Sequence, residues 1–152
     1  MNIAIVGSRK YPHLEDVARL VGIINRDDLD VGASTVIVSG GAEGVDTEAE
    51  KKALSLGMRV RSYRPYKVSD EEYGIEEWTL GERPSVRHMV EQPTFATYVD
   101  ALFYRNILVV DVSERVVAFW NEWSEGTRFT VGYARDRKKP VKLWTEKERL
   151  PC

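Results

Sequence analysis

Short apolar runs alternate with longer stretches of helical periodicity along most of this 152-residue chain. The runs have strand length, favour valine and isoleucine, and span residues 2–6, 34–40, 58–63, 115–120 and 140–144. The stretches between them repeat apolar side chains every three or four residues, and they cover residues 14–26, 44–57, 96–113 and 126–139. Strands that alternate with helices favour a parallel sheet, because each connection must cross a face of the sheet. We therefore expect an α/β fold.

The predicted architecture is a Rossmann-like three-layer sandwich with a parallel sheet of about five strands in the order 3-2-1-4-5. The run at 58–63 alternates apolar and polar residues, so it is placed nearer the edge of the sheet. Residues from about 64 to 97 break the pattern, and two interpretations stay open: an excursion over the ligand face, or a solvated insertion with a short helix near residues 85–90. No repeat or linker divides the chain, which predicts one domain over residues 1–152.

Composition excludes several classes of protein. The formal net charge of −2 provides no global basic field, so binding to bulk nucleic acid is not expected. Cys152 has no intrachain partner for a disulfide, which favours a reducing, cytoplasmic setting. The apolar runs are too short for a signal peptide or a membrane span, so no membrane partner is expected.

Glycine and hydroxyl residues follow three of the predicted strands. The three loops read "GSRKYP" from residue 7, "SGGAEG" from residue 39 and "NEWSEGT" from residue 121. The carboxyl ends of parallel strands meet at one edge of the sheet, and two of these loops run into a helix amino terminus, where free N–H groups favour an anion. Glycines at such corners also serve tight turns and close packing. Three such loops together predict a site for a phosphate-bearing ligand.

Common cofactor motifs are absent from these loops. The second loop has serine at the first glycine position of the dinucleotide fingerprint, and no acidic residue ends the third strand, which disfavours NAD. No glycine-lysine-serine/threonine run forms a P-loop. His13 and His88 lie far apart without the ligand spacing of a zinc site. Neither a cofactor nor a metal is expected.

The motifs "IAIVGSR", "VIVSGGAEGVD", "YRN", "VVAFWNEWSEGTRFT" and "KKPVKLW" resemble, in this order, those of the SLOG superfamily. This group includes DprA/Smf, the Lonely Guy (LOG) phosphoribohydrolases and the small YspA-like domains, and the YspA-like branch is the most similar. The resemblance implies a domain that binds, senses or processes nucleotides or nucleotide-derived small molecules. The matched ligand-binding positions are Gly7, Ser8, Arg9, Ser39, Gly40, Gly41, Gly44, Arg105, Asn106, Ser124, Gly126 and Thr127, and Trp120 is added because it ends the fourth strand.

One departure bears on catalysis. LOG enzymes carry proline-glycine-glycine before the last loop and a catalytic glutamate three residues after its threonine, where this chain has Trp123-Ser124-Glu125 and Thr130. The first hypothesis is therefore a binding or sensing module. The alternative is a hydrolase of an N-glycosidic or phosphate bond, with a base chosen from Glu43, Asp46 and Glu125.

Two further expectations concern partners. DprA-like binding of single-stranded DNA is a weaker alternative, which the net charge disfavours. Three tryptophans, Trp78, Trp123 and Trp144, are expected to be exposed and are candidates for the face of a homodimer or higher homo-oligomer.

Overall fold

The structure is a computed structural model that describes residues 1–31, 34–82, 85–90 and 94–151. Within these residues, seven strands form one sheet, in the order β5-β4-β3-β2-β1-β6-β7. The strands are β1 (Asn2–Gly7), β2 (Val36–Ser39), β3 (Arg59–Ser69), β4 (Glu72–Leu80), β5 (Val86–Met89), β6 (Arg115–Trp120) and β7 (Val141–Thr145). The helices are α1 (Leu14–Val31), α2 (Val45–Ser55), α3 (Tyr98–Asp111) and α4 (Glu125–Asp136).

The five predicted strands are confirmed, and they lie in the predicted relative order as β3-β2-β1-β6-β7. All four pairings among them are parallel; β1, for example, pairs Ile3 with Ile37 of β2 and Gly7 with Phe119 of β6. The α/β class is therefore correct. The count of five strands is wrong, because two antiparallel strands extend the sheet beyond β3.

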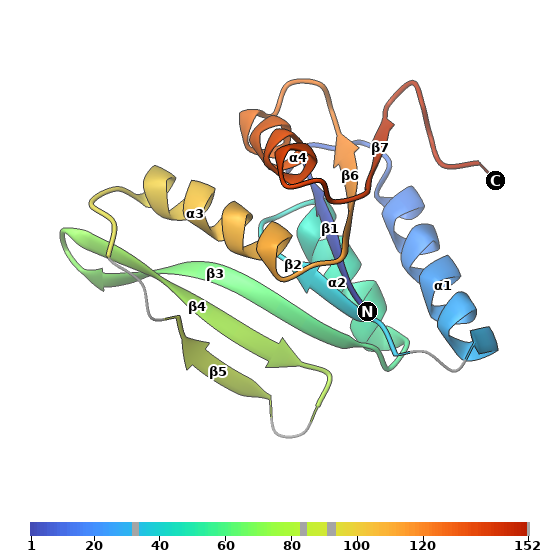
Figure 1. Ribbon diagram of the computed structural model, residues 1–152, viewed down its shortest axis with the longest axis horizontal. Coiled ribbons are helices and arrows are strands. Elements are labelled where there is room, and N and C mark those ends of the chain that lie inside the picture. Colours follow the sequence, from blue (N-terminus) through green and yellow to red (C-terminus); the bar gives the residue numbers. More distant parts are fainter. Residues whose placement is uncertain (32–33, 83–84, 91–93, 152) are drawn as a thin grey trace.

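Those two strands correct the prediction for residues 64–97. β3 continues to Ser69 and returns as β4, and the two strands form a long hairpin that projects to the left of Figure 1, with α3 lying along it. The segment at 85–90 contains the exposed strand β5 rather than a short helix. Because β4 covers β3, the strand at 58–63 lies inside the sheet and not near its edge.

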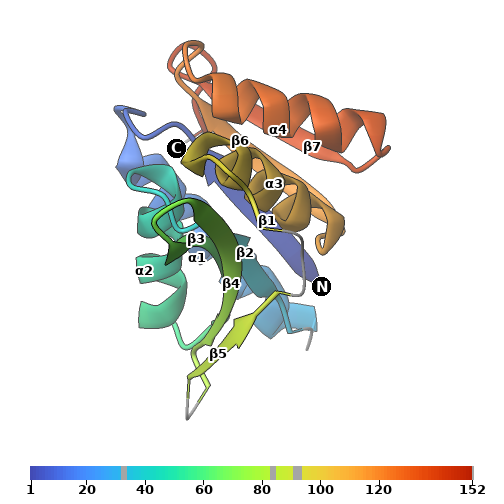
Figure 2. The same cartoon turned by 90° about the vertical axis from the view of Figure 1, so that its left-hand side faces the viewer.

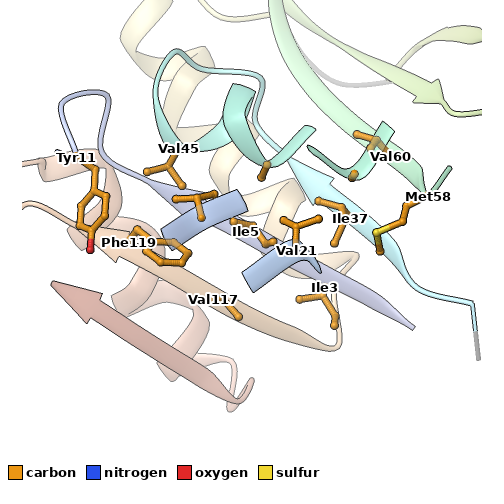
Figure 3. Close-up of a cluster of buried hydrophobic side chains, with 13 residues drawn as sticks. Ile3, Ile5, Tyr11, Val21, Ile37, Val45, Met58, Val60, Val117 and Phe119 are labelled. Atoms are coloured by element: carbon orange, nitrogen blue, oxygen red, sulfur yellow. The ribbon is translucent and has the colours of Figure 1, made fainter. Parts of the chain in front are cut away.

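Helices cover both faces of the sheet, as Figure 2 shows. Side chains of β1 alternate between two cores: Ile3 and Ile5 pack with α1 and α2, whereas Ala4 and Val6 pack with α3 and α4. Figure 3 shows the first core, in which the fully buried ring of Phe119 lies among side chains of β1, α1 and α2. This double coverage explains why the central strands are apolar on both faces.

Local signals set the ends of the helices. Thr97 caps α3 by accepting a hydrogen bond from the N–H of Asp100 at 3.1 Å. Gly57 follows α2 with a φ of 76°, a left-handed conformation that favours glycine. Within the described ranges no helix is both long and apolar enough to cross a membrane. Cys152 lies outside the described residues.

Candidate functional site

A pocket of about 540 Å³ opens where the strand order reverses, between β1 and β6. The chain fills the sheet on one side of β1 with β2 and β3, and later returns to the other side with β6 and β7. Such switch points are the usual ligand sites of open α/β sheets. Nine of the sequence-predicted residues line the pocket: Gly7, Arg9, Gly40, Asp46, Arg105, Asn106, Ser124, Gly126 and Thr127.

Arg105 is the most deeply buried cation of this pocket, with 6% of its surface exposed. Its guanidinium donates from Nη1 to the carbonyl oxygen of Gly40 and from Nε to Oδ1 of Asn106, the latter at 2.9 Å. Burial lowers the pKa of Arg105, the nearby carboxylate of Asp46 opposes that shift, and Arg9 adds to it. Among the described residues no carboxylate forms an ion pair with Arg105 within 4 Å. The guanidinium of Arg105 thus lies at the pocket without an ion-pair partner among the described residues.

Asp46 lies in the first turn of α2 and is 5% exposed. Its Oδ2 accepts a hydrogen bond from the N–H of Ala42 at 3.2 Å, whereas its buried Oδ1 has no partner among the described residues. Burial raises the pKa of Asp46 to about 6, and the charge of Arg105 limits that rise. The pocket therefore contains a carboxyl group that changes protonation near neutral pH.

The raised pKa of Asp46 predicts a pH-dependent loss of stability. The folded protein holds this proton up to about pH 6, whereas the unfolded chain releases it near the ordinary aspartate pKa of 3.8. The contribution of Asp46 to the free energy of unfolding should therefore fall as the pH rises from about 4 to 6, by up to roughly 3 kcal/mol, and stay constant above pH 7. Urea denaturation of the wild type and of Asp46→Asn across this pH range measures this contribution as the difference between their free energies of unfolding. A difference that is flat or rises with pH would contradict the assignment.

The three glycines of the second loop are each packed against an arginine. A Cβ atom at Gly40 would lie 2.8 Å from Cδ of Arg105, and one at Gly41 would lie 2.7 Å from Nε of Arg64. A Cβ atom at Gly44 would lie 2.5 Å from the main-chain oxygen of Arg9. The groups that approach these glycines are the protein's own arginines, as expected if the glycines serve close packing, whereas contact of the glycines with a ligand stays a prediction. The loop thereby holds Arg9 and Arg105 beside the same pocket.

Hydrogen bonds join the first loop to the last. Ser8 is 1% exposed, and its Oγ accepts a hydrogen bond from the N–H of Asn121 at 3.1 Å. Ser124 caps α4: its Oγ accepts from the N–H of Thr127 at 3.3 Å and from the hydroxyl of the same residue at 3.2 Å. A Cβ atom at Gly126 would meet only Asn106 Nδ2 and Ser124 Oγ, each at 3.9 Å. The first turn of α4 is therefore open towards the pocket, where its dipole favours an anion.

Some predicted site residues do not line the pocket. Ser39 is fully buried, and its Oγ accepts a hydrogen bond from the N–H of Gly41 at 3.0 Å. Trp120 is half-buried, and its indole N–H donates to the carbonyl oxygen of Ser124 at 3.0 Å. Both residues thus hold a loop in place. The remaining ones are Ser8 and Gly41, which are described above, Gly44, and the exposed carboxylates Glu43 and Glu125.

The pocket also contains polar and aromatic residues that were not among the predicted site residues. These are Lys10, Tyr98, Phe103, Asn121, Trp123 and Thr130. Lys10 and Arg9 are both exposed, and the structure shows no ion pair for either of them among the described residues. Two adjacent cations at the pocket provide a local positive charge that a net charge of −2 conceals. The adjacency of Arg9 and Lys10 in the sequence was the available signal.

Comparison with protein-family models gives a match for this chain. The family model described as DNA recombination-mediator protein A matches residues 1–150. This chain belongs to the DNA recombination-mediator protein A family. A comparison with curated proteins finds no match. The SLOG resemblance predicted from the loops is confirmed at the level of the superfamily, whereas the YspA-like branch stays a prediction.

Solved structures share the fold of this DNA recombination-mediator protein A domain at low identity. DNA processing protein A from Helicobacter pylori, described for its single-stranded DNA binding mode, is 21% identical over 95% of this chain and 65% of its own, with a TM-score of 0.63. DprA from Streptococcus pneumoniae is 19% identical over 93% of this chain and 49% of its own, with a TM-score of 0.67. The structural-genomics target TM1055 is 14% identical over 92% and 71%, with a TM-score of 0.58. The chain thus spans about half to two thirds of the two DprA structures.

Proposed function

We propose that this chain binds a nucleotide or nucleotide-derived small molecule, with the phosphate held between Arg9 and Arg105. The observation that carries the proposal is the convergence of these two arginines, from different elements, on one pocket at the strand-order switch point. A guanidinium donates to a phosphate in a planar, bidentate geometry. The open first turn of α4 adds main-chain N–H groups on the same pocket.

The charge balance supports this ligand. A buried cation without an ion pair is costly, and Arg9 adds a like charge close to Arg105. The carboxylate of Asp46 compensates in part, but its own pKa is raised, so it is partly protonated near pH 6. A phosphate in the pocket would supply the missing negative charge. Binding should therefore stabilise the folded chain.

A thermal-shift panel of nucleoside mono- and diphosphates, ADP-ribose and cyclic nucleotides tests the proposal. A ligand at 100 times its dissociation constant adds about 2.7 kcal/mol to the free energy of unfolding, or roughly 5–10 °C for a chain of this size. We expect at least one phosphorylated member to give such a shift and its dephosphorylated nucleoside to give none. A panel without any shift would contradict the proposal.

Asp46 favours a second function, hydrolysis of an N-glycosidic or phosphate bond. A carboxyl group with a pKa of about 6 is suited to general acid–base catalysis near neutral pH, and Asp46 lines the proposed phosphate pocket. Thr130 stands where LOG enzymes carry their glutamate, and its hydroxyl donates to the carbonyl oxygen of Gly126 at 2.8 Å. Chromatography of any ligand after incubation separates the two functions: unchanged ligand supports binding alone, and a released base or phosphate supports the hydrolase.

Single-stranded DNA is the other source of nucleotides to consider. Overall charge disfavoured nucleic acid, but family membership and the exposed pair Arg9 and Lys10 weaken that argument. A DNA backbone presents the same phosphate chemistry as a free nucleotide. A short single-stranded oligonucleotide therefore has to be tested as a ligand beside the free nucleotides.

Gly126→Leu should block the pocket without unfolding the chain. Gly126 lies in the first turn of α4 with free space around it, so a leucine side chain would extend into the proposed phosphate site. We expect the affinity for the ligand found in the panel to fall at least tenfold, while the melting temperature holds because leucine favours helix over glycine by up to about 1 kcal/mol. Gly132→Leu, in the same helix but away from the pocket, is the control. Equal affinities of the two variants would contradict the placement of the phosphate.

A further inference from the structure

The loop that follows β6 holds Trp123 in a fixed main-chain position. Oδ1 of Asn121 accepts hydrogen bonds from the N–H groups of Trp123 and Ser124, both at 2.9 Å. Glu122, which lies between Asn121 and Trp123, adopts a φ of 68°, a left-handed conformation that is uncommon for a residue with a side chain. The N–H of Asn121 is itself bound to Ser8 of the first loop. The backbone on both sides of Trp123 is therefore well anchored.

Trp123 is nevertheless 85% exposed. The expectation that Trp78 and Trp144 are also exposed is wrong, because both are half-buried. Trp78 donates from Nε1 to Glu76 at 3.0 Å and lies 5.7 Å from the guanidinium of Arg87. Trp144 lies 4.4 Å from Nζ of Lys142. Trp123 has no such ring contact or side-chain hydrogen bond among the described residues.

An exposed tryptophan on an anchored loop lines the same pocket as the two arginines. Burying an aromatic side chain of this size is favourable, so an indole left in water gains from any planar group that covers it. Tyr98, which begins α3 and is 45% exposed, and Phe103 give the pocket two further aromatic residues. The pocket thus combines a cationic part with an aromatic part.

We propose that Trp123 is a stacking platform for the base of a nucleotide whose phosphate is held by Arg9 and Arg105. The inference rests on the proposed function and goes beyond it, since it assigns a residue to the base and requires the ligand to carry a planar ring. Free mononucleotides and single-stranded DNA both supply a base next to a phosphate, so both are tested. Stacking of this kind tolerates different bases, because every base has a π-face.

Calorimetric titration of the wild type, Trp123→Ala and Trp123→Phe with adenosine 5′-monophosphate, ribose 5-phosphate and the oligonucleotide (dT)12 tests the platform. Loss of one stacked base weakens binding by 1–3 kcal/mol, so Trp123→Ala should bind the mononucleotide about 5- to 150-fold more weakly. Trp123→Phe should recover most of that loss. Ribose 5-phosphate, which has no base, should show no comparable loss. Trp78→Phe is the matched control and should bind all three ligands as the wild type does.

The oligonucleotide identifies the source of the base. A loss for both (dT)12 and the mononucleotide supports the platform with single-stranded DNA as a ligand, and a loss for the mononucleotide alone supports it with free nucleotides. An unchanged mononucleotide affinity in Trp123→Ala, with Arg9→Ala defective, overturns the platform while the phosphate site stands. Equal weakening for the mononucleotide and ribose 5-phosphate indicates a structural role and also overturns it. Absence of binding of all three ligands to the wild type overturns the platform, and a thermal-shift panel without any shift overturns the proposed function with it.

Discussion

Replacement of Arg9 by alanine is expected to abolish the thermal shift that a phosphorylated ligand produces, while the melting temperature of the free protein changes by no more than a few degrees. The side chain of Arg9 is exposed and lines the pocket, and it forms no hydrogen bond or ion pair among the described residues. Its removal therefore costs the fold little. Two charge-assisted hydrogen bonds to a phosphate are worth about 3 kcal/mol or more, so affinity should fall about 100-fold.

Arg115→Ala is the matched control for this experiment. Arg115 is also exposed, but it is the first residue of β6, whereas the pocket lies at the carboxyl ends of the strands. It carries the same charge, so any effect of net charge on binding is common to both variants. If the ligand raises the melting temperatures of Arg9→Ala and Arg115→Ala equally, Arg9 does not contact the phosphate.

Gly44→Ala should be the most destabilising single change in the second loop. Gly44 has a φ of 85° and a ψ of −121°, a conformation that a residue with a side chain adopts only at a cost of about 1–3 kcal/mol. The new methyl group would also lie 2.5 Å from the main-chain oxygen and 2.8 Å from the Cα of Arg9, so the first loop would have to move. We expect the free energy of unfolding, measured by urea denaturation, to fall by about 3 kcal/mol or more.

Gly57→Ala separates the two causes of that loss. Gly57 has a φ of 76°, but a Cβ atom at this position would have no neighbouring atom within 4 Å. Its substitution therefore costs only the backbone strain, about 1 kcal/mol. A Gly44→Ala loss no larger than that of Gly57→Ala would show that the contact with Arg9 does not hold the first loop.

The parallel part of the sheet was predictable because its signals are local. Each central strand is buried on both faces and reads as a continuous apolar run, as in "NIAIV" and "RVVAFW". The helices between them have an apolar stripe, and the handedness of the crossovers leaves few arrangements. The convergence of three loops on one pocket followed from that order alone.

The hairpin of β3 and β4 was not predictable in the same way, because distant residues stabilise it. Its strands carry many charges that pair across the ladder, for example Arg61 with Glu77 at 3.3 Å. Pro65 also disfavours a strand in a sequence-based prediction, because proline has no N–H to donate. In the structure the pairing of β3 with β2 ends at Ser62, so the missing N–H of Pro65 costs no hydrogen bond to β2. A single sequence gives no sign of either pairing.

The site was predicted in outline, and its internal contacts were not. Loop glycines are typical of tight turns and close packing, but the side chain that packs against Gly40 is Arg105 of α3, 65 residues further along the chain. Trp123 was expected to be exposed, and its place at the pocket follows from the turn that Asn121 makes. A side chain that caps its own loop is a local signal, and it could have indicated this orientation.

The position of the phosphate decides whether Arg9 and Arg105 bind the ligand. A crystal structure of the protein grown with the strongest ligand of the thermal-shift panel would locate it. We predict that the phosphate lies within hydrogen-bonding distance of the guanidinium groups of Arg9 and Arg105 and of the first turn of α4. A ligand bound elsewhere on the chain, or one whose phosphate points into solvent away from both arginines, would rule out the proposed phosphate site.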